Sequence, residues 1–357
     1  MGKDIFFYKS NCKYFLGYVP CKPHKNEGVH CNDCQYFKET DSVVLIIKLG
    51  AIGDVIRTSP LLYKIWEEHP RSQVWWLTYS PDIVPKSVDK VLGFTLESIL
   101  TLRATKFKLV INLDKDDYAC GLTKMLDAEK KIGYILENGK PSPINSEAHP
   151  KFITGLFDDA NQINNKTYLE EIFEICGWKF NKQEYILDCD TSISFNIPNN
   201  GKKIIGLNTG CGERWVSRLW SYDNWKELIF LLHKNNFFPL LLGGKQEDAK
   251  NMSLAKDTGA FYFGHFNLKE FISLVNHTDI VVTAVTMGLH IAVGLRKKVV
   301  LMNNIFNSKE FELYGRGIIV QPEKECKCFF SPKCKNPEYF CMDSLKPLTI
   351  FNSIQEL

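Results

Sequence analysis

Asp54 is a carboxylate at a position where a protein could carry out chemistry. It follows five apolar residues, 43–47, four of them β-branched, and it lies just after Gly50 and Gly53. Such a run predicts a buried parallel strand, and the glycines predict a turn into a helix. The turn would place backbone N–H groups and Asp54 at the carboxyl end of a sheet. Because a carboxylate is unsuited to binding phosphate, Asp54 is a candidate general base, although it would also serve as a helix N-cap.

Cysteines form the second set of residues with chemical potential. Eight of the twelve lie in two groups near the chain ends, and Cys31 and Cys34 have the two-residue spacing that can chelate one ion. Four thiolates suit zinc first and iron second, and each segment is too short to fold around its own core, so the ion would be structural. Disulfides or reduced surface thiols are the alternative. The predicted ligands are Cys12, Cys21, Cys31 and Cys34 in one group and Cys326, Cys328, Cys334 and Cys341 in the other.

Strands and helices alternate through most of the chain, which predicts an α/β protein with parallel sheets. The expected strands are 43–48, 73–78, 108–113, 203–208, 238–242, 279–283 and 298–302, and the clearest helices are 222–234, 246–257 and 286–295. Residues 138–165 have the composition of a long loop, and 196–202 that of a linker. The predicted organisation is a Cys-rich segment (1–41), two Rossmann-like domains (42–197 and 198–325), and a Cys-rich segment with a C-terminal helix (326–357).

Size and charge narrow the class of protein. The chain has 357 residues, 45% of them hydrophobic, which is enough for two domains with separate cores. A net charge of +3 gives no electrostatic reason to expect nucleic acid as a partner. There is no apolar run of about 20 residues and no signal-peptide pattern, so we expect a cytoplasmic protein.

Four separate stretches together resemble glycosyltransferase family 9, the heptosyltransferase-like enzymes of bacterial surface-polysaccharide assembly. They are KLGAIGD at 48–54, GCGERWVSRLW at 210–220, LGG at 242–244 and TMGLHIA at 286–292. The resemblance implies a GT-B fold, in which two Rossmann-like domains face a central cleft. It also implies an acceptor site mainly on the first domain, a nucleotide-sugar site mainly on the second, inversion at the anomeric carbon and no catalytic metal.

The resemblance also suggests roles for individual residues. Asp54 matches the family's catalytic base, and Arg218 matches a position that usually holds a phosphate-binding Lys. The acceptor-side loop would include Gly50, Ala51, Gly53 and Arg57. The donor site would be formed by Thr209, Gly210, Arg214, Arg218, Gln246, Glu247, Thr286, Met287, Gly288 and His290.

Two donor-side positions depart from the family pattern. Val285 replaces an acidic residue, and Gln246 stands where a ribose-binding Glu is common, although Glu247 is adjacent. These changes do not alter the expected reaction type, but they leave the identity of the donor open. The leading hypothesis is transfer of a sugar, heptose first, from a nucleotide-diphosphate sugar such as ADP-heptose to a lipopolysaccharide core, another glycan or a protein.

Alternatives remain at this stage. One is a GT-B transferase or epimerase that uses a UDP-sugar, and another is a non-catalytic, metal-stapled scaffold that has kept the fold. Peripheral association with the inner face of the membrane and a homo-oligomeric state are also left open.

Overall fold

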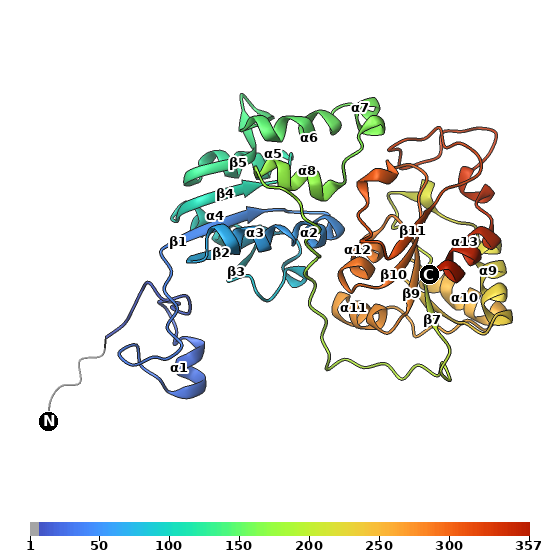
Figure 1. The fold of residues 1–357 in the computed structure, drawn as a ribbon, viewed down its shortest axis with the longest axis horizontal. Coiled ribbons are helices and arrows are strands. Elements are labelled where there is room, and N and C mark those ends of the chain that lie inside the picture. Colours follow the sequence, from blue (N-terminus) through green and yellow to red (C-terminus); the bar gives the residue numbers. More distant parts are fainter. Residues whose placement is uncertain (1–6) are drawn as a thin grey trace. The chain divides into compact units, whose positions relative to one another are not determined.

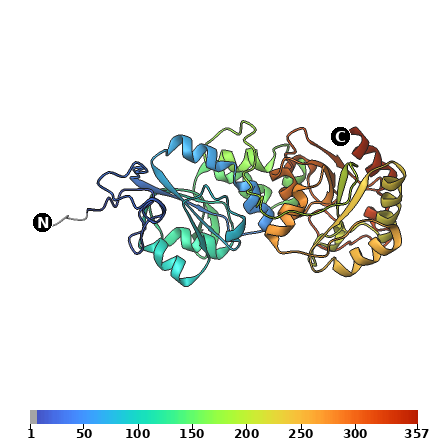
Figure 2. The same cartoon turned by 90° about the horizontal axis from the view of Figure 1, so that it is seen from below.

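The chain forms two compact units in the computed structural model, which describes residues 7–357. The first unit takes residues up to Leu49 together with Leu61–Ala148, and the second takes Gly50–Pro60 and His149–Leu357. Each unit has its own sheet flanked by helices (Figures 1 and 2). The prediction of an α/β protein with two Rossmann-like sheets is therefore confirmed.

The first unit contains a six-stranded sheet with the order β3-β2-β1-β4-β5-β6. Strands β1 to β5 pair in parallel, and β6 adds an antiparallel edge. The chain reverses its direction of progress across the sheet between β1 and β4, as it does in dinucleotide-binding folds. The strands are β1 (Ser42–Ile47), β2 (Ser72–Thr78), β3 (Lys90–Gly93), β4 (Lys106–Asn112), β5 (Asp127–Glu137) and β6 (Lys140–Pro143).

The helices of this unit bury apolar faces against that sheet. Leu45 and Ile47 of β1 share a core with Leu102 and Leu122 from two of the helices. The helices are α3 (Leu61–Glu68), α4 (Leu96–Arg103) and α5 (Asp117–Met125), with short 3-10 turns η1 (Pro81–Ile83) and η2 (Ser146–Ala148). Between residue 7 and β1, the described chain is irregular apart from α1 (Lys22–Glu27) and a bridge between Cys12 and Glu39.

The second unit contains a parallel five-stranded sheet with the order β11-β10-β9-β7-β8. Its strands are β7 (Ile204–Asn208), β8 (Phe238–Leu242), β9 (Ile280–Ala284), β10 (Lys298–Met302) and β11 (Gly317–Val320). Connections leave β7 toward β8 on one side and later return to β9 on the other. The point between β7 and β9 is thus where ligands are expected in such a sheet.

Helices cover both faces of this second sheet (Figure 1). One face shares a core with Trp225, Leu232, Leu254 and Ile350 from three helices, and α12 packs on the other face against β9 and β10. The helices are α9 (Tyr222–Lys234), α10 (Asp248–Thr258), α11 (Leu268–Asn276), α12 (Met287–Gly294) and α13 (Pro347–Glu356). The 3-10 turns are η3 (Val216–Arg218), η4 (Ser308–Glu310) and η5 (Cys341–Ser344).

The division into units differs from the domain boundaries expected from sequence. Helix α2 (Ile52–Thr58) packs on α12, and α8 (Tyr168–Ile175) packs on α2, so both belong to the second unit. The segment 138–165, expected to be a loop, contains β6, α6 (His149–Thr154) and α7 (Asp158–Ile163). Within residues 7–357, no helix has the length and apolar character needed to cross a membrane.

Candidate active site

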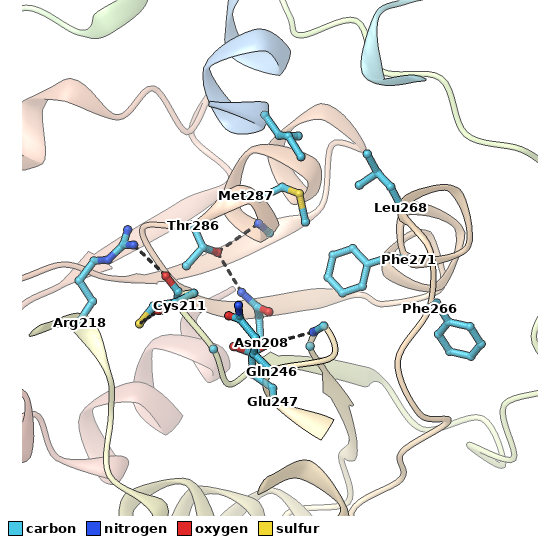
Figure 3. A pocket seen from close by; sticks show the side chains of 16 residues that line it. Asn208, Cys211, Arg218, Gln246, Glu247, Phe266, Leu268, Phe271, Thr286 and Met287 are labelled. Carbon is cyan, nitrogen blue, oxygen red and sulfur yellow. Dashed lines mark hydrogen bonds between the residues drawn. The ribbon is translucent and has the colours of Figure 1, made fainter. Parts of the chain in front are cut away.

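The carboxyl ends of β7, β8 and β9 form the floor of a pocket of about 400 Å³ in the second unit (Figure 3). Asn208 ends β7, Gly243 and Gly244 follow β8, and Thr286 follows β9. This is the switch point of the sheet, between β7 and β9. In open α/β sheets this edge is where ligands bind.

Asn208 and Thr286 fix the start of α12 at this floor. The Thr286 hydroxyl caps the helix by accepting from the Gly288 backbone N–H at 3.1 Å. Asn208 Nδ2 donates to Thr286 Oγ1 at 2.9 Å (Figure 3) and to Thr283 Oγ1 at 2.8 Å. A Cβ at Gly288 would lie 2.7 Å from Asn208 Nδ2, so glycine is required there. The N-terminus of α12, which is the positive end of its helix dipole, thus faces the pocket.

Glu247 shapes the opposite wall. Its carboxylate accepts from the Gly244 backbone N–H at 2.9 Å, and it also fills the space beside Gly210, where a Cβ would lie 2.0 Å from Oε1. Gln246 is exposed and also lines the pocket. Phe266, Leu268, Phe271 and Met287 form an apolar end (Figure 3).

Arg218 is a buried cation without an acidic partner in the part of the chain that the structure describes. It is 7% exposed, and Nη2 donates to the Cys211 backbone carbonyl at 3.1 Å (Figure 3), while Nε has no partner. The guanidinium lies 5.6 Å from the Trp215 ring centre and 5.5 Å from that of Phe306. Burial lowers the pKa of Arg218 to about 10, so it stays charged at neutral pH. Such a cation favours an anionic ligand.

A second pocket of about 470 Å³ shares Ile52, Arg218, Thr286 and Met287 with the first. It is lined by one end of α2, by the start of α12 and by aromatic residues of the Arg218 loop and its neighbours. Its other lining residues are Ala51, Gly53, Asp54, Arg57, Trp215, Val285, His290, Phe306, Glu310, Phe311 and Phe330. Asp54, the candidate base, and Arg218, the candidate phosphate-binding residue, therefore line one pocket.

Two ion pairs that share Arg57 lie in this second pocket. Arg57 Nη2 lies 2.8 Å from Asp54 Oδ1, and Arg57 Nη1 lies 2.7 Å from Glu310 Oε1. The Arg57 guanidinium carbon sits 3.5 Å from the Tyr168 ring centre. Despite burial, the two carboxylates raise the pKa of Arg57 above its ordinary value. Arg57 is thus a permanent cation shared by two acids.

His290 is buried against α2 rather than beside the glycine turns. Its ring lies 6.2 Å from that of Tyr185, it is 7% exposed, and Nδ1 has no partner. Burial, followed by the nearby Arg57 charge, lowers the pKa of His290 to about 3. The imidazole is therefore neutral at physiological pH, and its contribution to anion binding would be a hydrogen bond rather than a charge.

The predicted site residues are only partly brought together. Of the loop residues, Ala51 occupies the N-cap position of α2 without a side-chain hydrogen bond and lines the second pocket with Gly53 and Arg57, but Gly50 lines neither of the two pockets. Thr209 also lies outside the pocket linings, because its buried hydroxyl donates to Asn251 Oδ1 at 2.6 Å. Arg214 is exposed, with its guanidinium 5.4 Å from the Trp215 ring centre.

Several lining residues were not predicted. Asn208 carried a usable signal, since a polar residue ends an apolar strand at the expected ligand edge. Glu310, Phe306 and Phe330 carried none, because only the tertiary fold brings them to Asp54 and Arg218. Trp215 lies three residues before Arg218, within the GCGERWVSRLW stretch.

The eight cysteines predicted as metal ligands are all free thiols. Throughout residues 7–357, no three His, Cys, Asp or Glu side chains are already arranged to hold a metal ion. The C-terminal thiols instead form two pairs: Cys328 Sγ lies 3.8 Å from Cys334 Sγ, and Cys326 is hydrogen-bonded to Cys341. Cys12 is buried, whereas Cys21, Cys31 and Cys34 are partly exposed. Metal binding at either group stays a prediction.

The sequence and fold can be compared with those of known proteins. A family model described as glycosyltransferase family 9 (heptosyltransferase) matches residues 97–339, more than half of the chain. A comparison with curated proteins found no match.

Three solved structures show the likeness in fold. A family 9 glycosyl transferase from Veillonella parvula DSM 2008 is 13% identical, with a TM-score of 0.67 over 88% of this chain and 96% of that one. The E. coli heptosyltransferase WaaC with ADP is 14% identical, with a TM-score of 0.58 over 88% and 97%. The iron-containing dodecameric glycosyltransferase TibC from enterotoxigenic E. coli H10407 is 14% identical, with a TM-score of 0.53 over 89% and 78%. The two sheets thus match the GT-B type.

Proposed function

The chain belongs to glycosyltransferase family 9, the heptosyltransferase family, and we propose that it is an inverting transferase. The donor is a nucleotide-diphosphate sugar, and ADP-heptose is the first candidate to test. The acceptor is a hydroxyl of a lipopolysaccharide core, another glycan or a protein. Catalysis needs no metal at the reacting atoms, because positive groups for the leaving diphosphate are already in the pocket.

The observation that carries this proposal is the environment of Arg218. Arg218 is only 7% exposed and lacks an acidic partner in the described residues, and such a buried cation is costly unless an anion joins it. The α12 N-terminus lines the same two pockets through Thr286 and Met287. A diphosphate would fit both groups, and its negative charge grows as the sugar leaves.

Asp54 supplies the other half of the reaction. As the acceptor oxygen forms its bond to the anomeric carbon, its proton passes to the Asp54 carboxylate, and the carbon–oxygen bond to the diphosphate breaks. The nucleoside diphosphate departs with the bonding electron pair. Attack and departure on opposite sides of the carbon invert its configuration. Asp54 is 31% exposed on its side chain, so an acceptor can reach it.

The apolar end of the first pocket supports a nucleotide donor. Phe266, Phe271 and Met287 offer faces on which a base can stack, and Glu247 and Gln246 offer oxygens near the ribose. Glu247 already bonds the Gly244 backbone, which fixes its carboxylate at the pocket wall. We assign Glu247 the ribose role that Gln246 holds by sequence position.

The test is a donor panel assayed with purified protein and a bacterial glycan extract. ADP-heptose should release ADP only when the acceptor is present, and ADP should raise the melting temperature more than UDP does. A ligand at about 100 times its Kd adds about 2.7 kcal/mol of stability. A larger shift with UDP would favour a UDP-sugar transferase or epimerase. No shift with any nucleotide would favour a scaffold that has kept the fold.

We further propose a structural metal at the C-terminal cysteines. Each thiol pair can supply two ligands, and the Lys335 backbone N–H already donates to Cys328 Sγ at 3.0 Å, as suits a thiolate. Four thiolates favour zinc, and TibC, described as iron-containing and dodecameric, makes iron and self-association further subjects for test. Elemental analysis should find near-stoichiometric metal, lost on Cys328→Ser with Cys334→Ser. The N-terminal group is tested alike with Cys31→Ser and Cys34→Ser.

We propose that the enzyme works in the cytoplasm, at the inner face of the membrane when its acceptor is lipid-linked. Flotation of the protein with vesicles carrying a lipid-linked glycan would support membrane contact, and recovery in the unbound fraction would oppose it.

A further inference from the structure

Glu310 and Asp54 are held by the same guanidinium, although only Asp54 has a role in the reaction proposed above. Arg57 Nη2 bonds Asp54 at 2.8 Å, and Arg57 Nη1 bonds Glu310 at 2.7 Å. We propose that Glu310 is a positioning residue for sugar transfer: through Arg57 it holds the Asp54 carboxylate in place and keeps it able to accept a proton. This inference rests on the proposed role of Asp54.

Arg57 alone would make Asp54 a poor base. A neighbouring guanidinium stabilises the ionised carboxylate and typically lowers an Asp pKa by about 1 to 3 units. The Arg57 side chain is only 12% exposed, which limits the screening of its charge by solvent. An isolated Asp54–Arg57 pair is neutral, and protonating Asp54 would leave a bare buried cation. Arg57 alone would thus orient the Asp54 carboxylate but make it less basic.

Glu310 changes this balance. With both carboxylates ionised, the three groups carry a net charge of −1. When Asp54 takes the acceptor's proton, Arg57 and Glu310 remain as a neutral pair, so no unpaired charge is created. A second carboxylate on the same guanidinium also disfavours the charge on Asp54 and raises its proton affinity. Glu310 therefore offsets part of the effect of Arg57.

Contacts with other elements hold both Arg57 and Glu310 in place. Arg57 is stacked on Tyr168, the first residue of α8, with its guanidinium carbon 3.5 Å from the ring centre. Glu310 lies on η4, whose cap Asn307 donates through Nδ2 to the backbone carbonyls of Asn161 at 2.7 Å and Asn164 at 2.6 Å. The guanidinium is thereby fixed from α2, α8 and η4 within the second unit.

His290, Tyr185 and Arg218 do not change their protonation state around neutral pH. Burial lowers the pKa of His290 to about 3 and raises the pKa of Tyr185, so both side chains stay neutral. Arg218 stays cationic, with a pKa lowered by burial to about 10. The ionisable groups that share a pocket with Asp54 or contact Arg57 are Tyr168 on α8, Arg218 on η3, His290 on α12 and Glu310 on η4. Tyr185, between α8 and β7, and Glu312, two residues after Glu310, line a smaller pocket with Arg57 and Glu310.

The test compares the pH profile of kcat at saturating donor for the wild type, Glu310→Gln and Arg57→Gln. Gln at 310 still accepts from Arg57, so only the charge is removed. We expect the acid limb of Glu310→Gln to move to lower pH and kcat to fall by about tenfold, with the Kd for ADP unchanged. Arg57→Gln should move the acid limb to higher pH. These opposite directions are not expected from a merely structural role.

Glu312→Gln is the matched control. Glu312 lies two residues further on and pairs with Lys182 rather than Arg57, so the same charge change should leave the profile in place. Arg57→Lys should retain part of the wild-type profile. An unchanged profile in Glu310→Gln, or a shift of both variants in the same direction, would overturn the inference.

A second measurement does not depend on turnover. Carboxyl-carbon NMR titration should give a lower Asp54 pKa in Glu310→Gln than in the wild type, and equal values would again overturn the inference. If the wild type transfers no sugar from any donor, the proposed function fails, while this titration still decides whether Glu310 controls the Asp54 pKa.

Discussion

Gly53 packs directly against the imidazole of His290, so that a Cβ at position 53 would lie 2.5 Å from His290 Cδ2. This contact joins α2, which carries Asp54, to α12, whose N-terminus lines both pockets. Gly53→Ala should therefore destabilise the protein by about 1 to 3 kcal/mol, because overpacking forces a shift of helix or ring. Urea unfolding of the purified variant measures this cost.

A second glycine provides the control. Gly121 is also helical, but a Cβ there would make only an ordinary contact, 3.7 Å from Leu136 Cδ2. Gly121→Ala should leave the free energy of unfolding unchanged or raise it by about 0.5 to 1 kcal/mol. If Gly53→Ala were as stable as Gly121→Ala, the close packing of α2 on α12 would be wrong.

His290 should make stability depend on pH. Its pKa is about 3 in the folded chain and about 6.5 when unfolded, so below pH 6.5 the unfolded chain binds the extra proton. Stability should fall as pH falls from about 6.5 toward 3, by up to about 2 kcal/mol at pH 5 from this residue. Urea unfolding at pH 6.5 and at pH 5 should show a smaller difference in the free energy of unfolding for His290→Gln than for the wild type.

The exposed His149 serves as the comparison for that experiment. His149→Gln should keep the full wild-type pH dependence between pH 6.5 and pH 5. If His290→Gln also kept it, the buried and neutral state of His290 would be refuted.

Arg218 should matter for the donor and not for folding. Replacing it by Met removes a buried cation that lacks an acidic partner in the described residues, so the free energy of unfolding should not fall. The Kd for ADP should rise by roughly tenfold or more, since a charge-assisted hydrogen bond contributes about 1.5 to 3 kcal/mol. Isothermal titration calorimetry measures this change.

Arg214→Met is the paired substitution, because Arg214 is exposed and contacts the face of the same Trp215 ring. It should bind ADP with nearly the wild-type Kd. Equal losses for the two arginines would mean that the general positive charge of the loop, and not the buried position of Arg218, attracts the nucleotide.

Local sequence patterns predicted most of the sheet. The continuous apolar run before Gly50 became β1, and the later runs became β2, β4 and β7 to β10 within one or two residues. Strand β3 is short and half-buried, and β11 is mostly half-buried, so neither carries a strong apolar pattern. The prolines, glycine and Asn of residues 138–165 predict a loop, whereas the structure has two six-residue helices there, neither with a buried residue to give an apolar pattern.

The site was predictable where it follows from strand ends and not where it depends on tertiary contacts. Thr286 and Gly288 follow β9 and line the first pocket, and Asp54 on α2 lines the second. Glu310 was missed because it meets Arg57 across 253 positions of sequence. Sequence spacing also could not show that α2 would join the second unit through its contact with α12.

The central claim is that Asp54 takes the acceptor's proton while the pocket around Arg218 holds the nucleotide. The most direct measurement is acceptor-dependent ADP release from ADP-heptose by Asp54→Asn, alongside its Kd for ADP. The account predicts that release falls by about 10² to 10⁴-fold while the Kd stays at its wild-type value. Release at the wild-type rate would contradict it.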